Sequence, residues 1–385
     1  MSKYFQSIKK GYKFKNYVNY VLVLALLGVS SLIMFTGSVK LSMASLFTQI
    51  GFSIILAVSL NVVVGFLGEL SLGHAGFMCI GAYIGGFAAV GFSSVIDSKL
   101  LVLVIAMLIG GLVATVFGFI IGLPSLRLKG DYLAIVTLAF GEIVRNIFKN
   151  QKLFGAAMGL NTSVIKYDTR TSPTLFVVTF VVALIMLIVV QNFIRSKHGR
   201  AVTAIRDNEI AAKAMGINVT FYKLFAFMLS SFFAGIAGVI YAHYATPVNY
   251  SFFSYNYSIE ILVMVVLGGM GNITGSIVAA TAISLINYSL QKYLSGNLAA
   301  MKYLIYALIL IIMVIFSNAP ALADLRRRFR DFFAHILKLG KKHDPANINS
   351  DEASWDRIPT KIRMDELLST DINVGDNKSQ SKKGE

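Results

Sequence analysis

The chain has 385 residues, of which 56% are apolar and only 14% are charged, with a mean hydropathy of +0.69. Soluble domains carry about 25% charged residues, so a soluble globular protein is excluded. The net charge of +16 lies in short clusters between long apolar runs, which is typical of polytopic membrane proteins and argues against a nucleic-acid partner. The one cysteine, Cys79, excludes a disulfide framework and a Cys-based metal centre.

Eight stretches contain no Asp, Glu, Lys or Arg and reach the roughly 20 residues that a helix needs to cross a bilayer. They are 16–39, 41–68, 70–96, 100–126, 171–194, 224–259, 261–291 and 303–323. In hydrocarbon every backbone N–H and C=O must be hydrogen-bonded within the protein, so we expect these stretches to be helical. The short alternating segments typical of a β-barrel do not occur.

Two further spans are plausible. Residues 132–148 are apolar except for Glu142 and Arg145, and the stretch from Tyr257 to Leu294 is broken into two helices by glycines near Gly269. The predicted fold is all-α: a polytopic membrane protein of about ten transmembrane helices, with glycine-broken segments in two related halves.

The basic clusters predict the orientation and the domains. Residues 1–17 form a basic N-terminus, residues 18–323 the transmembrane domain with a loop at 195–223, and residues 324–385 a polar tail. With the N-terminus inside and ten spans, most basic clusters fall on the cytoplasmic side. The loop 145–172 is basic yet would face outward, which favours a re-entrant segment at 132–148. The first apolar stretch is too long for a cleaved signal peptide.

The tail begins with large apolar residues at helical spacing among arginines, from Phe329 to Leu337. This pattern predicts an amphipathic basic helix on the inner membrane face, with a stop-transfer charge cluster as the alternative. Residues from 344 onward are polar and predicted to be mostly disordered.

The sequence contains no Gly-x-x-x-x-Gly-Lys-[Ser/Thr] phosphate loop, and its five histidines are too scattered for a metal site. No cofactor and no enzyme activity are therefore expected for this chain. A transporter, channel or receptor is the expected class.

Charged residues inside a membrane are costly, and each is a candidate functional group. Glu142 lies three residues before Arg145, a spacing that predicts an ion pair. Glu260 lies at the edge of a stretch and is expected to reach the interface. Glu69, in Gly-rich sequence, is a candidate for the translocation path. So few ionisable groups count against a proton-coupled transporter.

Two Gly-rich interruptions, 65–76 and 268–275, stand in corresponding places of the chain. Broken helices of this kind point to a passage site, whereas small-xxx-small pairs such as Gly81/Gly85 and Gly271/Gly275 point to close packing. The predicted pathway residues are Asn61, Glu69, Ser71, Gly73, His74, Tyr83, Gly268, Gly269 and Gly271.

The 195–223 loop favours one short helix over residues 201–215, stopped by Gly216. Ala211 and Ala212 would let a partner approach closely, and Arg206 and Glu209 could pair across the helix. A short helix of this kind suits docking onto a cytoplasmic motor.

Glu209 followed by Ala211, Ala212 and Gly216 resembles the Glu-Ala-Ala…Gly loop of ABC-importer permeases. Other segments, in the right order over roughly residues 45–290, resemble the LivM-type permeases of branched-chain amino acid importers. They are Gly68 to Phe77 with Gly81 to Tyr83, Leu126 to Leu138 with Phe140 to Ile143, Gly199 to Gly216, and Met264 to Gly271.

The resemblance implies a permease subunit without ATPase activity in a bacterial cytoplasmic (inner) membrane, with both termini inside. Its expected partners are a second homologous permease, two cytoplasmic ATPases, an extracytoplasmic amino-acid-binding protein and membrane lipids. Leu, Ile and Val are the expected cargo. The alternatives are the same architecture importing urea or short amides, an ion-coupled secondary transporter or channel, and a non-transporting receptor.

Overall fold

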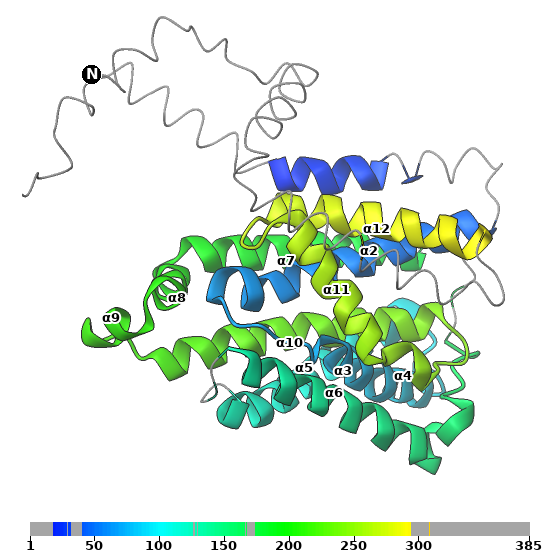
Figure 1. Cartoon of the computed structure of the whole chain (residues 1–385). Helices are drawn as coiled ribbons and strands as arrows, with labels where there is room; N and C mark the ends of the chain where they lie inside the picture. The colour runs from blue at the N-terminus through cyan, green and yellow to red at the C-terminus, as the bar shows by residue number, and fades with distance from the viewer. Residues whose placement is uncertain are drawn as a thin grey trace, which may run out of the picture. The chain divides into compact units, whose positions relative to one another are not determined.

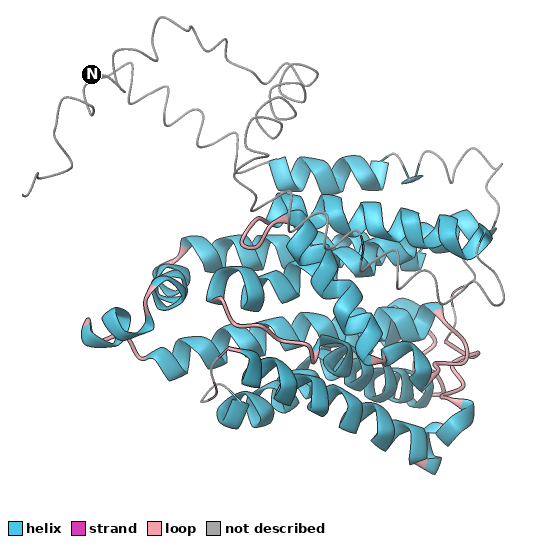
Figure 2. Ribbon diagram, in the orientation of Figure 1, coloured by secondary structure: helices cyan, strands magenta, loops and turns pink. Residues whose placement is uncertain are grey.

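The computed structural model describes residues 18–28, 30–31, 41–125, 128, 130–165, 167, 174–293 and 308. The predicted N-terminus 1–17, the tail 324–385 and all of the stretch 303–323 except residue 308 lie outside these residues. The described part is helical without a strand, and its one isolated β-bridge joins Leu160 and Val248 (Figure 2). The all-α prediction is confirmed.

Five helices of the described part are long and apolar enough to cross a membrane, and three shorter apolar helices accompany them. The chain is therefore a polytopic helical membrane protein, while the total of about ten spans stays a prediction. The long helices are Ser45–Leu67, His74–Phe92, Lys99–Pro124, Thr174–Arg195 and Val219–Tyr244, and the short ones are Val18–Gly28, Tyr255–Gly268 and Ile273–Ser289.

Figure 1 shows how the elements are arranged along the chain. They are α2 (Leu41–Asn61), η1 (Val62–Leu67), α3 (His74–Ile80), η2 (Gly81–Gly85), α4 (Gly86–Phe92), α5 (Lys99–Ser125), α6 (Asp131–Asn150), η3 (Lys152–Phe154), η4 (Ala156–Met158), α7 (Thr174–Arg195), α8 (Lys197–Asp207), α9 (Glu209–Ala214), α10 (Val219–Tyr244), η5 (Tyr250–Phe253), α11 (Tyr255–Gly268) and α12 (Ile273–Tyr293).

The helices α2 and α10 form the centre of the bundle. The helix α10 packs against α5, α3, η2 and α2, while α2 also packs against α12, α7 and α11. The span built from α2 and η1 is 94% buried inside the protein, whereas that of α5 is only 39% buried. The open side of α5 carries a row of exposed apolar side chains: Leu100, Leu101, Val104, Leu108, Leu112, Val116, Phe119, Ile120 and Leu123. A surface this apolar requires lipid or another protein as its neighbour.

Close backbone contact joins η2 to α10. A Cβ atom placed on Gly81 would lie 2.0 Å from the carbonyl oxygen of Gly235. Only glycine permits this approach, so the packing explanation suffices at Gly81.

The helix α6 covers the stretch predicted as a short or re-entrant span, and it is not among the five long apolar helices because of its charges. Arg145 pairs with Glu142 at 2.6 Å, which confirms the predicted ion pair. The other carboxylate oxygen of Glu142 accepts the amide of Tyr255 at 3.0 Å, which ties α6 to the start of α11.

Glu260 does not reach the interface, so that prediction was wrong. Its side chain is buried between α11 and α12, where it accepts a hydrogen bond from the amide nitrogen of Asn287. Buried polar groups are normally hydrogen-bonded, and a facing amide inside the bundle replaces water as the partner of this carboxylate.

Candidate functional site

The loop after α7 forms two short helices, not the single helix predicted over 201–215. The backbone of Asn208 is extended (φ −158°, ψ 104°), and its side chain accepts the amide of Ala211 at 3.0 Å. An Asn side chain that bonds its neighbouring backbone competes with helix continuation and caps the next helix. The helix therefore breaks at Asn208 into α8 and α9, which lie together beyond the ends of α7 and α10 (Figure 1).

The predicted stop at Gly216 is confirmed. Gly216 has φ +81°, and its amide donates to the carbonyl of Lys213 at 3.1 Å. The next amide, of Ile217, donates to the carbonyl of Ala212 at 3.1 Å. This pair of bonds is the Schellman closure of a helix C-terminus, which glycine permits because it tolerates a positive φ.

The two Gly-rich interruptions are two breaks between helices. The first break, residues 68–73, separates η1 from α3, and the second break, residues 269–272, separates α11 from α12. This confirms the predicted division of the long stretch near Gly269. Positive φ angles occur at Gly68 in the first break and at Gly269 and Gly271 in the second.

The second break touches the helix that leads into the first. A Cβ atom on Gly65 would lie 2.2 Å from the backbone nitrogen of Gly271. Asn61 forms two hydrogen bonds at the same place. Its Oδ1 accepts from the backbone N–H of Gly271 at 2.9 Å, and its Nδ2 donates to the hydroxyl of Ser276 at 2.9 Å. Sequence segments more than 200 residues apart therefore meet at one point.

Arg206 reaches from the end of α8 to this meeting point. Its Nη1 donates to the carbonyl of Gly65 at 3.0 Å, and its Cγ lies 2.6 Å from where a Cβ of Gly68 would be. Its Nε and Nη2 donate to Asp207 at 3.2 and 3.0 Å. A Cβ atom on Gly271 would lie 3.5 Å from the same Nη1, so Arg206 contacts both breaks.

A second link uses Lys223, in the first turns of α10, which the prediction of site residues missed. Its ammonium is bonded to Glu69 at 2.5 Å and to Glu209 at 3.2 Å, and its side chain is only 3% exposed. Lys223 therefore joins the first break to the start of α9. Arg206 and Glu209, predicted to pair with each other, have different partners here.

The remaining predicted residues of the first break belong to a buried polar layer. The Nε2 of His74 lies 2.9 Å from the hydroxyl of Ser59, Ser71 is buried, and Gly73 lies against the carbonyl oxygen of Thr137. Gly268, the last residue of α11 before the second break, lies against the backbone of Gly275. All these contacts connect helices within the bundle.

Tyr83 is the predicted site residue that the structure does not bring to the breaks. It lies about two and a half helical turns beyond His74. Its ring stacks on Phe148 with the centroids 4.6 Å apart, and its hydroxyl donates to the carbonyl of Val248 at 3.1 Å.

The helix α9 and the residue that follows it expose two large apolar side chains beside the exposed Lys213. Ile210 is 78% exposed and Met215 83% exposed, with exposed Ala211 between them in sequence. Ala212, predicted to face a partner, is buried within this chain. The described residues contain no group of three or more His, Cys, Asp or Glu that could hold a metal ion. Charge pairs and close backbone contacts thus join α8 and α9 to the two breaks.

Comparisons with known proteins give one family. A family model described as branched-chain amino acid transport system / permease component matches residues 42–314. The high-affinity branched-chain amino acid transport system permease protein LivM of Salmonella typhimurium is 36% identical over 259 residues, which cover 59% of this chain and 58% of the relative.

Two relatives come from Methanocaldococcus jannaschii. Its probable branched-chain amino acid transport permease protein LivM is 27% identical over 283 residues, 63% of this chain and 78% of the relative. Its probable permease protein LivH is 27% identical over 146 residues, 37% of this chain and 45% of the relative. The chain thus spans 58% of the length of its Salmonella relative. No solved structure matches it.

Proposed function

The chain belongs to the family of branched-chain amino acid transport system permease components, and on that premise we propose that it is the transmembrane permease subunit of an ABC importer. It forms half of a pathway for Leu, Ile and Val, and ATP hydrolysis takes place on partner chains. The observation that carries this proposal is the junction at which α8 and α9 are bonded to two helix breaks. A transport subunit driven from outside needs such a link between a docking element and its pathway.

In this proposal α9 is the docking element. Ile210 and Ala211 on α9 and Met215 directly after it are exposed apolar side chains for contact with an ATPase subunit, with the exposed Lys213 beside them. Force on α9 reaches the first break through Glu209 and Lys223, and force on α8 reaches both breaks through Arg206. A displacement of the loop by the ATPase then shifts Asn61 and the glycines of both breaks together.

The proposed pathway runs beside the breaks. Asn61, Ser71, Gly73, His74, Gly268, Gly269 and Gly271 stay the candidates for its lining or its movement, while Glu69 acts as part of the link to α9. Tyr83, held by Phe148 and Val248, belongs to the opposite end of the helix.

The proposed partners are a second homologous permease, two cytoplasmic ATPases and an extracytoplasmic amino-acid-binding protein, in a bacterial cytoplasmic membrane. A pair of permeases is supported by relatives of both the LivM and the LivH names in one organism. The exposed apolar side of α5 supplies a surface for that second permease or for lipid. Both termini and the loop of α8 and α9 are placed in the cytoplasm, following the basic clusters.

The experiment that tests this function is purification of the tagged chain from its host in mild detergent. We expect two ATPase chains and a second permease to copurify, and the ATPase activity to rise when leucine-loaded binding protein is added. Stimulation by binding protein loaded with urea or short amides, and not with leucine, would keep the transporter class and overturn the cargo. Uptake that follows an ion gradient without ATPase partners would overturn the class.

A further inference from the structure

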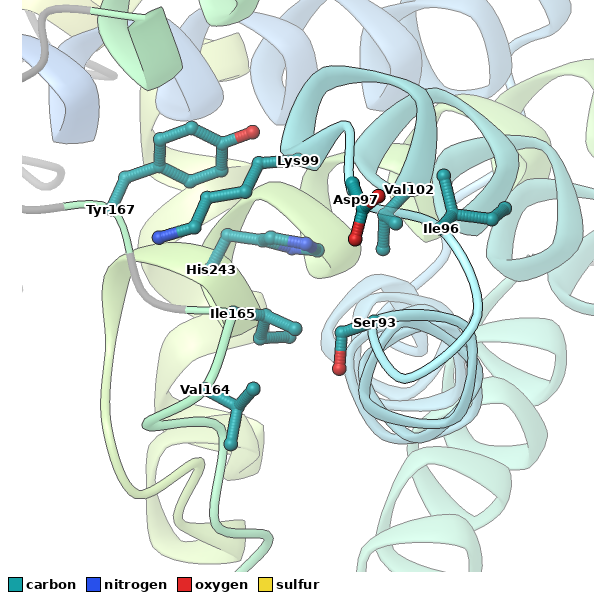
Figure 3. A pocket seen from close by; sticks show the side chains of 9 residues that line it. All are labelled: Ser93, Ile96, Asp97, Lys99, Val102, Val164, Ile165, Tyr167 and His243. Carbon is teal, nitrogen blue, oxygen red and sulfur yellow. The ribbon is translucent and has the colours of Figure 1, made fainter.

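A pocket of about 170 Å³ lies at the end of α10 opposite to the junction (Figure 3). His243 in the pocket and Lys223 in the junction stand 20 residues apart on one helix, which corresponds to about 30 Å. The pocket walls come from the connection of α4 to α5, the first turn of α5, the loop after η4 and the last turn of α10. The lining residues are Ser93, Ile96, Asp97, Lys99, Val102, Val164, Ile165, Tyr167 and His243.

The floor of the pocket holds two buried polar atoms without a hydrogen-bond partner in the described part of the chain, His243 Nε2 and the hydroxyl of Tyr167. His243 is 1% exposed, and its Nδ1 is hydrogen-bonded to the carbonyl of Val239 at 2.9 Å. Because a carbonyl only accepts, Nδ1 carries the proton and Nε2 of the neutral ring is left as an acceptor. Burial raises the pKa of Tyr167, so its hydroxyl remains a donor at neutral pH.

The mouth of the pocket carries two opposite charges. Asp97, in the connection, and Lys99, at the start of α5, are exposed, and the described residues give neither of them an ion-pair partner. Between mouth and floor the wall is apolar, with Ile96, Val102 and Ile165. In Figure 3 the His243 ring and the Asp97 carboxylate point toward one another, whereas the Lys99 ammonium and the Tyr167 hydroxyl point to different sides of the pocket. The pocket therefore offers two acceptors side by side, two separate donors and an apolar wall.

We propose that this pocket binds an α-amino acid as its zwitterion, with an aliphatic side chain. The ligand ammonium pairs with the Asp97 carboxylate and His243 Nε2, which point toward one another, and the ligand carboxylate pairs with the Lys99 ammonium. The aliphatic side chain lies against Ile96, Val102 and Ile165. Drug-sized ligands need pockets of about 300–1,000 Å³, so the smaller volume selects a small solute.

The proposal rests on the proposed function for its cargo class. It adds to that function a second place where the chain binds the cargo. The pocket lies on the face of the membrane that receives the binding protein, whereas the two breaks lie near the ATPases. An amino acid released at the pocket would be held there by this chain before it passes between the permeases.

The test is equilibrium binding of radiolabelled leucine to the purified complex in the absence of binding protein. We expect saturable binding that weakens about tenfold or more in Lys99→Gln and in Asp97→Asn, because each removes a charge-assisted contact. Lys152→Gln is the matched control: it removes one exposed lysine from the loop that leads into the pocket, and it should leave leucine binding within about twofold of the parent.

Two analogues test the need for both charges. Isovalerate lacks the ammonium and isoamylamine lacks the carboxylate, so both should bind at least tenfold more weakly than leucine. Leucine binding that is absent, or that is unchanged in both variants, overturns the pocket. In the same preparations, stimulation of the ATPase by leucine-loaded binding protein shows whether the proposed function stands independently of the pocket.

Discussion

Lys223 illustrates how one buried charge can connect three segments. Its side chain is 3% exposed, and its two carboxylate partners come from the first break and from α9. A buried ammonium is tolerated only when it is paired, because removing it from water costs several kcal/mol. Both carboxylates in turn depend on Lys223, so its loss would leave two acids facing each other in a poorly hydrated space.

We expect Lys223→Met to destabilise the chain by about 2–3 kcal/mol, less than for a fully buried pair since Glu209 is partly exposed. The measurement is the midpoint of thermal unfolding in detergent. Lys213→Met, which removes an exposed lysine from α9, is the control and should leave the midpoint unchanged.

The double variant Glu69→Gln with Lys223→Met tests whether the two side chains interact. Its unfolding midpoint is compared with those of the two single variants. If the charge pair is formed, the double variant is less destabilised than the sum of the single variants. Strict additivity would contradict the contact.

At the scale of elements, the two breaks behave as one unit because η1 and the second break are in backbone contact. The carbonyl of Gly65 accepts from Arg206, and the backbone nitrogen of Gly271 lies where a Gly65 side chain would be. Any enlargement at Gly65 must therefore separate the two breaks or displace Arg206. In the proposed function, this contact carries a movement of α8 to both breaks.

Gly65→Ala should reduce leucine uptake at least tenfold per assembled complex, since its methyl group would lie 2.2 Å from the nitrogen of Gly271 and 1.8 Å from Oδ1 of Asn61. Uptake is measured in cells and normalised to the copurifying ATPases. Gly91→Ala is the control: its methyl meets nothing within 4 Å, so uptake should match the parent. Normal uptake by Gly65→Ala would show that the breaks need no direct contact.

For the whole molecule, the orientation is open to chemical labelling. Cys79 is the only cysteine and is buried, so the parent chain provides a low background. We expect a membrane-impermeant maleimide to label Ser98→Cys, beside the pocket, in intact cells. Lys213→Cys, on α9, should be labelled only after permeabilisation. Labelling of both positions from the same side would refute the proposed orientation.

The helical fold was predictable from sequence because hydrocarbon leaves the backbone no alternative to helix, so that charge-free length alone indicates a span. The stop at Gly216 and the pair of Glu142 with Arg145 were predictable because their contacts are local. The break at Asn208 was missed because residues 201–215 otherwise favour a helix, and the cap outweighs that preference.

The role of Lys223 was missed for a different reason. Its partner Glu69 lies 154 residues away, and nothing in the local sequence of either residue identifies the other. Asn61 was predicted as a pathway residue, but its hydrogen bond with Gly271 could not be predicted, because the two residues meet only in the tertiary structure. Long-range pairs of this kind depend on how helices are arranged, which periodicity does not encode.

The exposed apolar side chains of α5 should vary among family members in a way that depends on what covers them. A side chain that touches only lipid tails can be exchanged for any other apolar residue of similar length, whereas one seated against another protein must keep its shape. Rapid exchange among Leu, Ile, Val and Phe along this row would therefore identify a lipid neighbour. A strip of unvarying residues within it would mark the seam with a second subunit.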